Sequence, residues 1–228
     1  MKNVVITGAN RGIGLGFVRH YLNRGDQVWA CVREASPALL DLNSERLNIV
    51  TCDVSQDLAE EWAQNAGIPD EVHVLVNNAG IYGPKRNEGQ TLTEVSSGAM
   101  LEVFNVNSVG PLRTVQALRT RVIAGKGTIA NVSSKMGSSD DNTSGGCYAY
   151  RASKAALVIM SKSMAIDLEE YGVKVATLHP GWVRTDMTSH NGLIDVEQSV
   201  AGMTTVIEKV DDYPLGSFIA FDGKVIPF

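Results

Sequence analysis

The sequence predicts a doubly wound α/β protein, in which one parallel sheet carries helices on both of its faces. Short apolar runs rich in Val and Ile alternate along the chain with stretches whose apolar residues recur at helical spacing. The expected strands are apolar at consecutive positions, as parallel strands are when helices cover both sides. The 228 residues contain no repeat, low-complexity segment or linker, so we expect a single domain over residues 1–228 with about seven strands.

The first half of the chain begins with an apolar run at residues 3–7, which Thr7 and Gly8 close. Residues 13–23 then repeat apolar side chains at helical spacing before Gly25 interrupts the pattern. The elements expected next are, in chain order, a strand at 27–32, a short helix near 37–42, a strand at 47–52, a helix at 58–66 and a strand at 72–77. These strands are short runs rich in β-branched residues, which favour sheets.

The second half continues the alternation and contains the strongest predicted helix, at residues 150–171. That segment has apolar residues at positions 155, 156, 159, 160 and 164, and Gly172 follows it where helices commonly end. The other elements expected here are a long helix at 99–123, a strand at 127–132, a strand at 173–178, a helix at 196–209 and a short strand at 217–221. Right-handed crossovers should join the parallel strands.

The composition argues against several classes of protein. The net charge is −5, from 20 Lys and Arg against 25 Asp and Glu, and basic runs are absent, so neither nucleic acid nor an anionic membrane surface is an expected partner. No apolar stretch approaches the roughly 18 residues that a membrane span needs. The chain begins with a strand rather than a leader. The three cysteines and four histidines show no pairing or metal-ligand spacing, so we expect free thiols, no metal site and a cytoplasmic location.

A glycine-rich turn lies at the first junction between strand and helix. In a doubly wound sheet, ligands bind beyond the carboxyl ends of the strands, where the strand order reverses. Three glycines let the backbone turn tightly there and approach a pyrophosphate, to which the next helix offers free N–H groups. The residues assigned to this nucleotide site are Gly8, Asn10, Arg11, Gly12, Ile13 and Gly14. Their spacing differs from the common Gly-x-Gly-x-x-Gly, and a merely structural turn is the alternative.

The end of the second strand indicates which dinucleotide is preferred. A carboxylate at this position would bind the adenosine ribose 2′-hydroxyl and repel a 2′-phosphate. Here the strand ends in Val32 and Arg33, and Arg11 adds a second guanidinium from the glycine-rich turn. Because guanidinium groups suit a phosphate through bidentate hydrogen bonds, we expect NADP(H) rather than NAD(H). Glu34 weakens the argument, and each arginine has the alternative of being a solvated surface charge.

Tyr150 and Lys154 stand at the start of the strongest helix. Residues at i and i+4 share a helix face, so these two side chains should lie side by side. A phenol with a pKa of about 10 is a poor proton donor or base near neutral pH, and a cation about 4 Å away is worth roughly 1–4 kcal/mol. We therefore expect Lys154, together with an oxidised nicotinamide, to lower the pKa of Tyr150 by about a unit or more. The alternative is a surface tyrosine.

Taken together and in order, these motifs resemble the short-chain dehydrogenase/reductase family. The resemblance rests on residues 7–14, Asp53, residues 77–80, Asn107, Ser134, Tyr150 with Lys154, and Pro180-Gly181 followed by Thr185. Residues 133–138, 142–146, 148–151 and 221–227 are also similar to the C-factor/sniffer-like branch, whose members are associated with NADPH-dependent carbonyl reduction or with developmental signalling. The resemblance implies a Rossmann-type fold and a homodimer or homotetramer.

The resemblance also implies a role for each matching residue. Tyr150 would be the general acid that protonates the oxygen of an aldehyde or ketone, Lys154 would lower its pKa and hold the nicotinamide ribose, and Ser134 would polarise the substrate oxygen. Asn107 would position the lysine and a proton-relay water. The other cofactor contacts are assigned to Asp53 and Val54 near the adenine, to Asn78, Ala79 and Gly80 on the adenosine side, and to Pro180, Gly181, Val183 and Thr185 near the nicotinamide.

Substrate choice and the protein's role stay open at this point. Ser134 and Tyr150 are sixteen residues apart, a longer spacing than is usual in the family, and the extra residues fall in the polar stretch 138–146, expected to be a loop beside the pocket. A short flexible lid is expected at 187–198, and His179 is expected to be a packing residue. The alternative to a reductase is a cofactor-binding signalling protein. A nucleotide-sugar epimerase is disfavoured, because too few residues follow Thr185 for a second domain.

Overall fold

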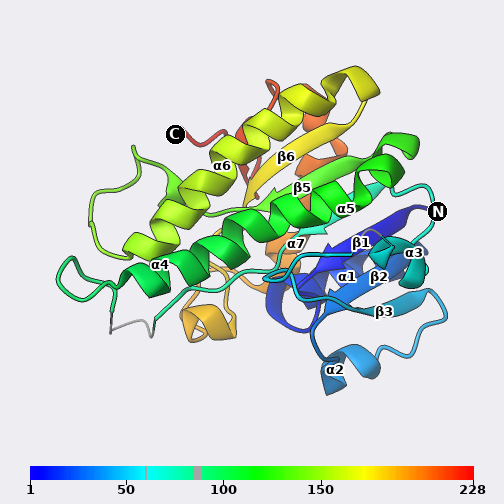
Figure 1. Ribbon diagram of the computed structural model, residues 1–228, viewed down its shortest axis with the longest axis horizontal. Helices are drawn as coiled ribbons and strands as arrows, with labels where there is room; N and C mark the ends of the chain where they lie inside the picture. The colour runs from blue at the N-terminus through cyan, green and yellow to red at the C-terminus, as the bar shows by residue number, and fades with distance from the viewer. Residues whose placement is uncertain (60, 85–88) are drawn as a thin grey trace.

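The computed structural model describes residues 1–59, 61–84 and 89–228, and their strands form one parallel sheet (Figure 1). The strands are β1 (Asn3–Thr7), β2 (Gln27–Val32), β3 (Leu47–Thr51), β4 (Val74–Asn77), β5 (Thr128–Val132), β6 (Lys174–His179) and β7 (Phe218–Ala220). Their order across the sheet is β3-β2-β1-β4-β5-β6-β7, and every neighbouring pair is parallel. The predicted doubly wound α/β class is confirmed, and the strand order reverses between β1 and β4.

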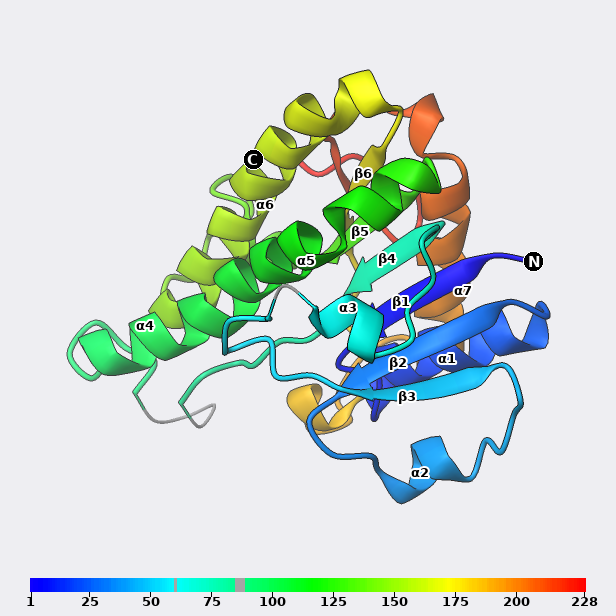
Figure 2. The same cartoon turned by 45° about the vertical axis from the view of Figure 1, so that its right-hand side comes forward.

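Helices cover both faces of the sheet, and the two layers are separated in Figure 2. On one face lie α1 (Gly12–Asn23), the short α2 (Pro37–Leu40) and α7 (Val196–Glu208); on the other lie α3 (Trp62–Asn65), α5 (Gly110–Ala124) and α6 (Tyr148–Leu168). Successive residues of β1 supply the two cores in turn. Val4 and Ile6 pack with α1 and α7, whereas Val5 packs with α5 and α6, because side chains alternate across a strand.

The long helix predicted at residues 99–123 is interrupted. It consists of α4 (Ser97–Phe104), a π-helical turn (Asn105–Val109) and α5. Pro111 has no N–H to donate in the α-helical register, and the N–H of Gly110 bonds to the carbonyl of Asn105, five residues earlier. The π turn contains Asn107, one of the predicted site residues.

The remaining differences from the predicted elements lie at their ends. Helix α6 begins at Tyr148 rather than at Tyr150, and a 3₁₀ turn (Glu169–Tyr171) continues it to Gly172, which has φ +74°. The helix predicted at 58–66 is only α3; Gly67, with φ +64°, follows its end, and position 60 lies outside the described residues. All other boundaries agree within two residues.

The C-terminal tail covers the outer edge of β7. The N–H of Ala220 donates to the carbonyl of Lys224 at 2.8 Å, and the N–H of Ile226 donates to the carbonyl of Phe218 at 2.7 Å. Ser138 donates through its hydroxyl to the carbonyl of Pro227, which ties the tail to the loop after β5. Among the described residues, the helices are too short or too polar to cross a membrane.

Candidate active site

A cavity of about 810 Å³ lies at the carboxyl ends of the strands, at the point where the strand order reverses. Its walls come from the loops after β1, β2, β3 and β4 and from the segment after β6. The residues of the predicted cofactor site that line it are Gly8, Asn10, Arg11, Gly12, Ile13, Arg33, Asp53, Val54, Asn78, Ala79, Gly80 and Thr185. Such a volume is within the range of about 300–1,000 Å³ that ligand pockets occupy.

The glycines of the turn let its backbone pack closely against the neighbouring chain. Gly8 has φ +64°, and a Cβ atom there would lie 2.8 Å from the Cα of Ala79. A Cβ on Gly14 would lie 2.1 Å from the carbonyl oxygen of Gly8, so α1 packs directly beneath the turn. Because α1 begins at Gly12, which lines the cavity, its first N–H groups stand at the wall. These features fit a bound pyrophosphate.

Hydrogen bonds fasten the turn to the end of β4. The hydroxyl oxygen of Thr7 accepts from the backbone N–H groups of Asn78 and Ala79, each at 3.1 Å. The side-chain amide of Asn78 donates to the carbonyls of Thr7 and Gly8, again at 3.1 Å. The side chain of Asn78 thus shapes the cavity by holding the two strand ends together.

The end of β2 presents an exposed cation to the cavity. Asn10 accepts from the N–H of Ser36 at 2.8 Å, which joins the glycine-rich turn to the loop that carries Arg33. Among the described residues, Arg33 has no carboxylate within ion-pair distance. Asp53, after β3, accepts from the N–H and the hydroxyl of Ser55, and the backbone hydrogen bond is the main reason that its pKa is lowered.

Arg11 crosses the mouth of the cavity. Its guanidinium lies 2.8 Å from the carboxylate of Asp186, which is also 3.1 Å from the ring of His190. The hydrogen bond from Arg11 lowers the pKa of Asp186. From the sequence, Arg11 was assigned to a phosphate and Asp186 was not singled out. The signal available for Asp186 was an acidic residue directly after Thr185. An ion pair this exposed is worth about 0–1 kcal/mol, so a phosphate can compete for the arginine.

Pro180, Gly181 and Val183 lie outside the cavity lining and shape the segment that brings Thr185 to it. Gly181 has φ +85°, and a Cβ atom there would lie 2.7 Å from the side chain of Ile194. Val183 is buried and forms a β-bridge with Ile194. The residues of the predicted lid that do line the cavity are Met187, His190 and Val196.

Tyr150 and Lys154 lie one turn apart on α6, and both are buried. The ammonium of Lys154 donates to the carbonyl of Val132 at 2.8 Å and stands 5.7 Å from the centre of the Tyr150 ring. A Cβ atom on Gly80 would lie 3.5 Å from that ammonium nitrogen. Gly80 lines the cavity, whereas Tyr150, Lys154, Ser134 and Asn107 lie outside its lining.

The two neighbouring serines after β5 have different partners. The hydroxyl of Ser134 accepts from the N–H of Met136 at 3.2 Å and lies close enough to the Tyr150 hydroxyl to affect its pKa, whereas the hydroxyl of Ser133 donates to the backbone carbonyl of Lys154 at 3.0 Å. Gly137 seats the turn against α6, because a Cβ atom there would lie 2.6 Å from the backbone of Lys154 and of Ala155. The long spacing between Ser134 and Tyr150 therefore still brings their hydroxyls together, with the extra residues forming turns after residue 138.

Burial governs the ionisation of this cluster. It raises the pKa of Tyr150 to about 12, and the nearby hydroxyl of Ser134 offsets only part of that rise. It also lowers the pKa of Lys154 to about 8. Desolvation of the phenolate is therefore the larger effect on Tyr150, and the lowering of its pKa by Lys154 together with an oxidised nicotinamide stays a prediction.

Asn107 connects the cluster to the loop after β4. Its side-chain oxygen accepts from the N–H of Ile81, and its amide donates to the carbonyl of Ile81, both at 2.8 Å. The same amide donates to the hydroxyl of Ser153 on α6 at 3.0 Å. A Cβ atom on Gly80 would lie 3.2 Å from the Asn107 oxygen, so the π turn, the loop and α6 meet beside the cavity.

Two residues near the cluster were not singled out as site residues by the sequence. His179 accepts from the backbone N–H of Lys135 at 3.3 Å and so supports the turn that carries Ser134; burial lowers its pKa to about 4. Tyr82 lies against Tyr150, with ring centres 4.9 Å apart. The signal for Tyr82 was an aromatic residue in the loop after β4, five positions beyond the end of that strand.

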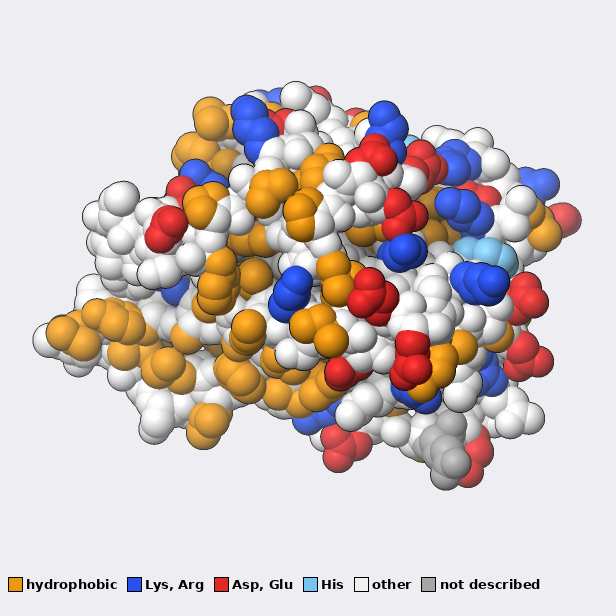
Figure 3. Space-filling view, turned by 90° about the horizontal axis from the view of Figure 1, so that it is seen from above, with side chains coloured by type: hydrophobic (Ala, Val, Ile, Leu, Met, Phe, Trp, Pro, Cys, Tyr) orange, Lys and Arg blue, Asp and Glu red, His pale blue; other side chains and the backbone are white. Residues whose placement is uncertain are grey.

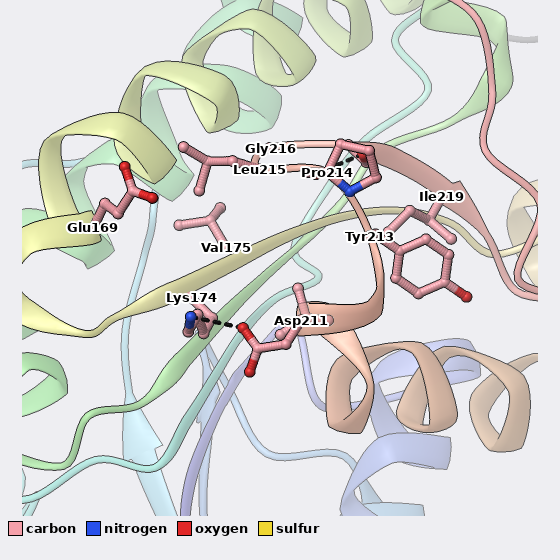
Figure 4. Close-up of a pocket in the computed structure, with 11 residues that line it drawn as sticks. Glu169, Lys174, Val175, Asp211, Tyr213, Pro214, Leu215, Gly216 and Ile219 are labelled. Carbon is pink, nitrogen blue, oxygen red and sulfur yellow. Dashed lines mark hydrogen bonds and ion pairs between the residues drawn. The ribbon is translucent and has the colours of Figure 1, made fainter.

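A second cavity, of about 190 Å³, lies near the opposite end of β6, where this strand begins (Figure 4). Lys174 and Asp211 in its wall are ion-paired at 2.6 Å, and the rest of the lining is mainly loop before β7. It contains none of the predicted site residues. Within the described part of the chain, groups of His, Cys, Asp and Glu suited to a metal ion are also absent.

Comparison with known proteins agrees with this geometry. Residues 2–193 match the family model for short chain dehydrogenases. The C-signal protein of Myxococcus xanthus is 39% identical over 158 residues, which are 69% of this chain and 93% of that protein. The carbonyl reductase Sniffer of D. melanogaster is 33% identical with a TM-score of 0.91 over 100% of both chains. The NADPH-bound carbonyl reductase from chicken fatty liver is 31% identical, with a TM-score of 0.86 over 100% of this chain and 99% of that one.

Proposed function

The chain belongs to the short-chain dehydrogenase family, and from this premise we propose that it is an NADP(H)-dependent reductase of aldehydes or ketones. The observation that carries the proposal is that the cluster around Tyr150 lies next to the cavity. Tyr150, Ser134 and Lys154 stand close together, and Gly80, which lines the cavity, lies next to the lysine. The similarity to two carbonyl reductases over the whole chain supports the substrate class.

The residues around the cavity fit a nicotinamide dinucleotide phosphate. The start of α1 and the glycine-rich turn would receive the pyrophosphate, because the first N–H groups of the helix stand at the cavity wall. Arg33 would receive the 2′-phosphate, since its guanidinium is exposed beside the cavity and Asp53 follows β3 rather than standing at the end of β2. The bound cofactor would supply the hydride.

Tyr150 would supply the proton. With a pKa raised to about 12, its phenol is protonated throughout the neutral range and can donate to an oxygen that gains alkoxide character. Ser134 would hold that oxygen beside the phenol by a second hydrogen bond. Lys154, whose pKa is lowered to about 8, is still mainly charged at neutral pH, and its ammonium would stabilise the phenolate left after proton transfer.

The test is the initial rate of NADPH and NADH oxidation with a panel of aldehydes, diketones and isatin-like ketones. We expect turnover with NADPH well above the rate with NADH. The similarity to C-signal favours a second candidate, a cofactor-binding signalling protein. Tight NADPH binding without turnover of any carbonyl, together with partner binding that the cofactor alters, would support that candidate and contradict the reductase.

We also propose that the protein is a cytoplasmic homo-oligomer. All three cysteines are free, as in a reducing compartment. Figure 3 shows hydrophobic side chains gathered toward the end of the molecule where α4 and the first half of α6 lie. The exposed large hydrophobic residues on these two helices are Leu101, Phe104, Tyr148, Ile159 and Ile166. Sedimentation velocity should give a dimer or tetramer that Leu101→Glu weakens; a monomer at all concentrations would contradict this part of the proposal.

A further inference from the structure

We infer that Tyr82 is a positioning residue for Tyr150: its ring holds the phenol of Tyr150 in place, and Cys147 holds Tyr82. The inference rests on the proposed function, because it gives Tyr82 a part in the same site. Tyr82 would support Tyr150 at a second point, in addition to Ser134. Ser134 lies near the hydroxyl of Tyr150, whereas Tyr82 contacts its ring.

The contact between the two rings is close. Their centres are 4.9 Å apart and their planes are inclined by 38°, within the range of favourable aromatic pairs. Tyr150 keeps only 8% of its surface exposed. The hydroxyl of Tyr82 lies 3.0 Å from the Sγ atom of Cys147, so the far end of the Tyr82 ring is also held.

The loop that carries Tyr82 is fixed on both sides of this residue. Before it, both backbone polar groups of Ile81 bond to the side chain of Asn107 at 2.8 Å. After it, Gly83 has φ +104°, and a Cβ atom there would lie 2.8 Å from Val103 on α4 and 4.0 Å from Ala149 on α6. The backbone at Tyr82 therefore has little freedom to move away from Tyr150.

Cys147 ties the same ring to the start of the helix that carries Tyr150. It precedes α6 in a left-handed conformation, with φ +51°, and its N–H donates to the carbonyl of Gln90 at 2.9 Å. Tyr82 thus spans the loop after β4 and the first turn of α6. Displacement of a reacting group by about 1 Å lowers turnover by roughly a hundredfold, so support of the Tyr150 ring has a direct kinetic consequence.

Two substitutions at position 82 distinguish the contribution of the Tyr82 ring from that of its hydroxyl. Tyr82→Leu removes the ring contact, and we expect kcat with a carbonyl substrate to fall by roughly ten- to a hundredfold. The KM for NADPH should stay within about twofold, because Tyr82 is absent from the lining of the cofactor cavity. Tyr82→Phe keeps the ring and should restore kcat to within about threefold of wild type. Wild-type kcat in Tyr82→Leu, or an equal loss in Tyr82→Phe, would overturn the inference.

The reaction of Cys147 with Ellman's reagent tests the same contact without any turnover. Cys31 and Cys52 are 1% and 6% exposed, so the fast-reacting thiol of the native protein is Cys147, and Cys147→Ser gives the baseline. Tyr82→Leu should raise the rate of this thiol by roughly threefold or more, because the group that covers it is gone. An unchanged rate would overturn the inference. A wild-type protein that reduces no carbonyl would instead contradict the proposed function, while the thiol result would still decide the contact.

Discussion

Because the ammonium of Lys154 is buried, the free energy of unfolding should depend on pH. The variant Lys154→Met should lack this contribution to the pH dependence. The side chain is 4% exposed, and burial lowers its pKa from 10.5 to about 8. In the unfolded chain the same group keeps its ordinary value. At neutral pH the folded state therefore carries a buried charge that destabilises it. The hydrogen bond to the carbonyl of Val132 offsets part of this destabilisation.

The magnitude follows from linkage. Between pH 8 and 10.5 the unfolded chain holds a proton on Lys154 that the folded chain has released, so the stability of the wild type rises with pH across this window. At roughly 1.4 kcal/mol per unit, the rise is about 3 kcal/mol. Below pH 8 both states are protonated and the penalty is constant. Lys154→Met has no such titration, although it leaves the Val132 carbonyl unpaired at about 1–3 kcal/mol.

The assay is urea unfolding of the wild type and Lys154→Met from pH 7 to 10.5, without nucleotide, with Lys209→Met as an exposed control for the lost charge. At pH 7 the variant should match the wild type or exceed it by up to about 2 kcal/mol. The difference should then shift by about 3 kcal/mol in favour of the wild type as pH rises. A difference that stays constant over the whole range would refute the argument that the ammonium is buried and destabilising.

Four further variants test the cavity and the serines. Gly14→Ala forces a Cβ atom to within 2.1 Å of a carbonyl oxygen, so urea unfolding should show a loss of about 1–3 kcal/mol and fluorescence titration no tight NADPH binding. Arg33→Ala should raise the Kd of NADPH by roughly tenfold or more with little change for NADH; equal changes would contradict the 2′-phosphate assignment. Ser134→Ala should lower kcat by about 10²–10³, whereas Ser133→Ala should keep kcat and lose about 1 kcal/mol of stability, and the reverse pattern would exchange their roles.

Much of the fold was predictable because its signals are local. Apolar runs such as Val4 to Ile6 need two buried faces, and a parallel sheet between helices provides them. The break in the helix at Asn105–Val109 was missed, because helical periodicity continues through a π turn, although Pro111 was a visible reason to expect an interruption.

The site was predictable where backbone geometry decides it and less so where long-range contacts do. The glycines at positions 8, 12 and 14 must be small because the chain passes close to itself. The partner of Arg11, by contrast, stands 175 positions away, and spacing contains no information about such a pair. The predicted effect of Lys154 and an oxidised nicotinamide on the pKa of Tyr150 stays a prediction, and burial, which the sequence does not report, acts on this pKa in the opposite direction.

The most direct test of the account follows the hydride and the proton donor together. NADPH labelled with deuterium at C4 of the nicotinamide would be incubated with a reactive ketone, with wild type and with Tyr150→Phe, and the alcohol analysed by mass spectrometry. We expect deuterium on the carbinol carbon with wild type, and at least a hundredfold less alcohol with Tyr150→Phe at nearly unchanged NADPH affinity. Labelled alcohol at the wild-type rate from Tyr150→Phe would contradict the role given to Tyr150.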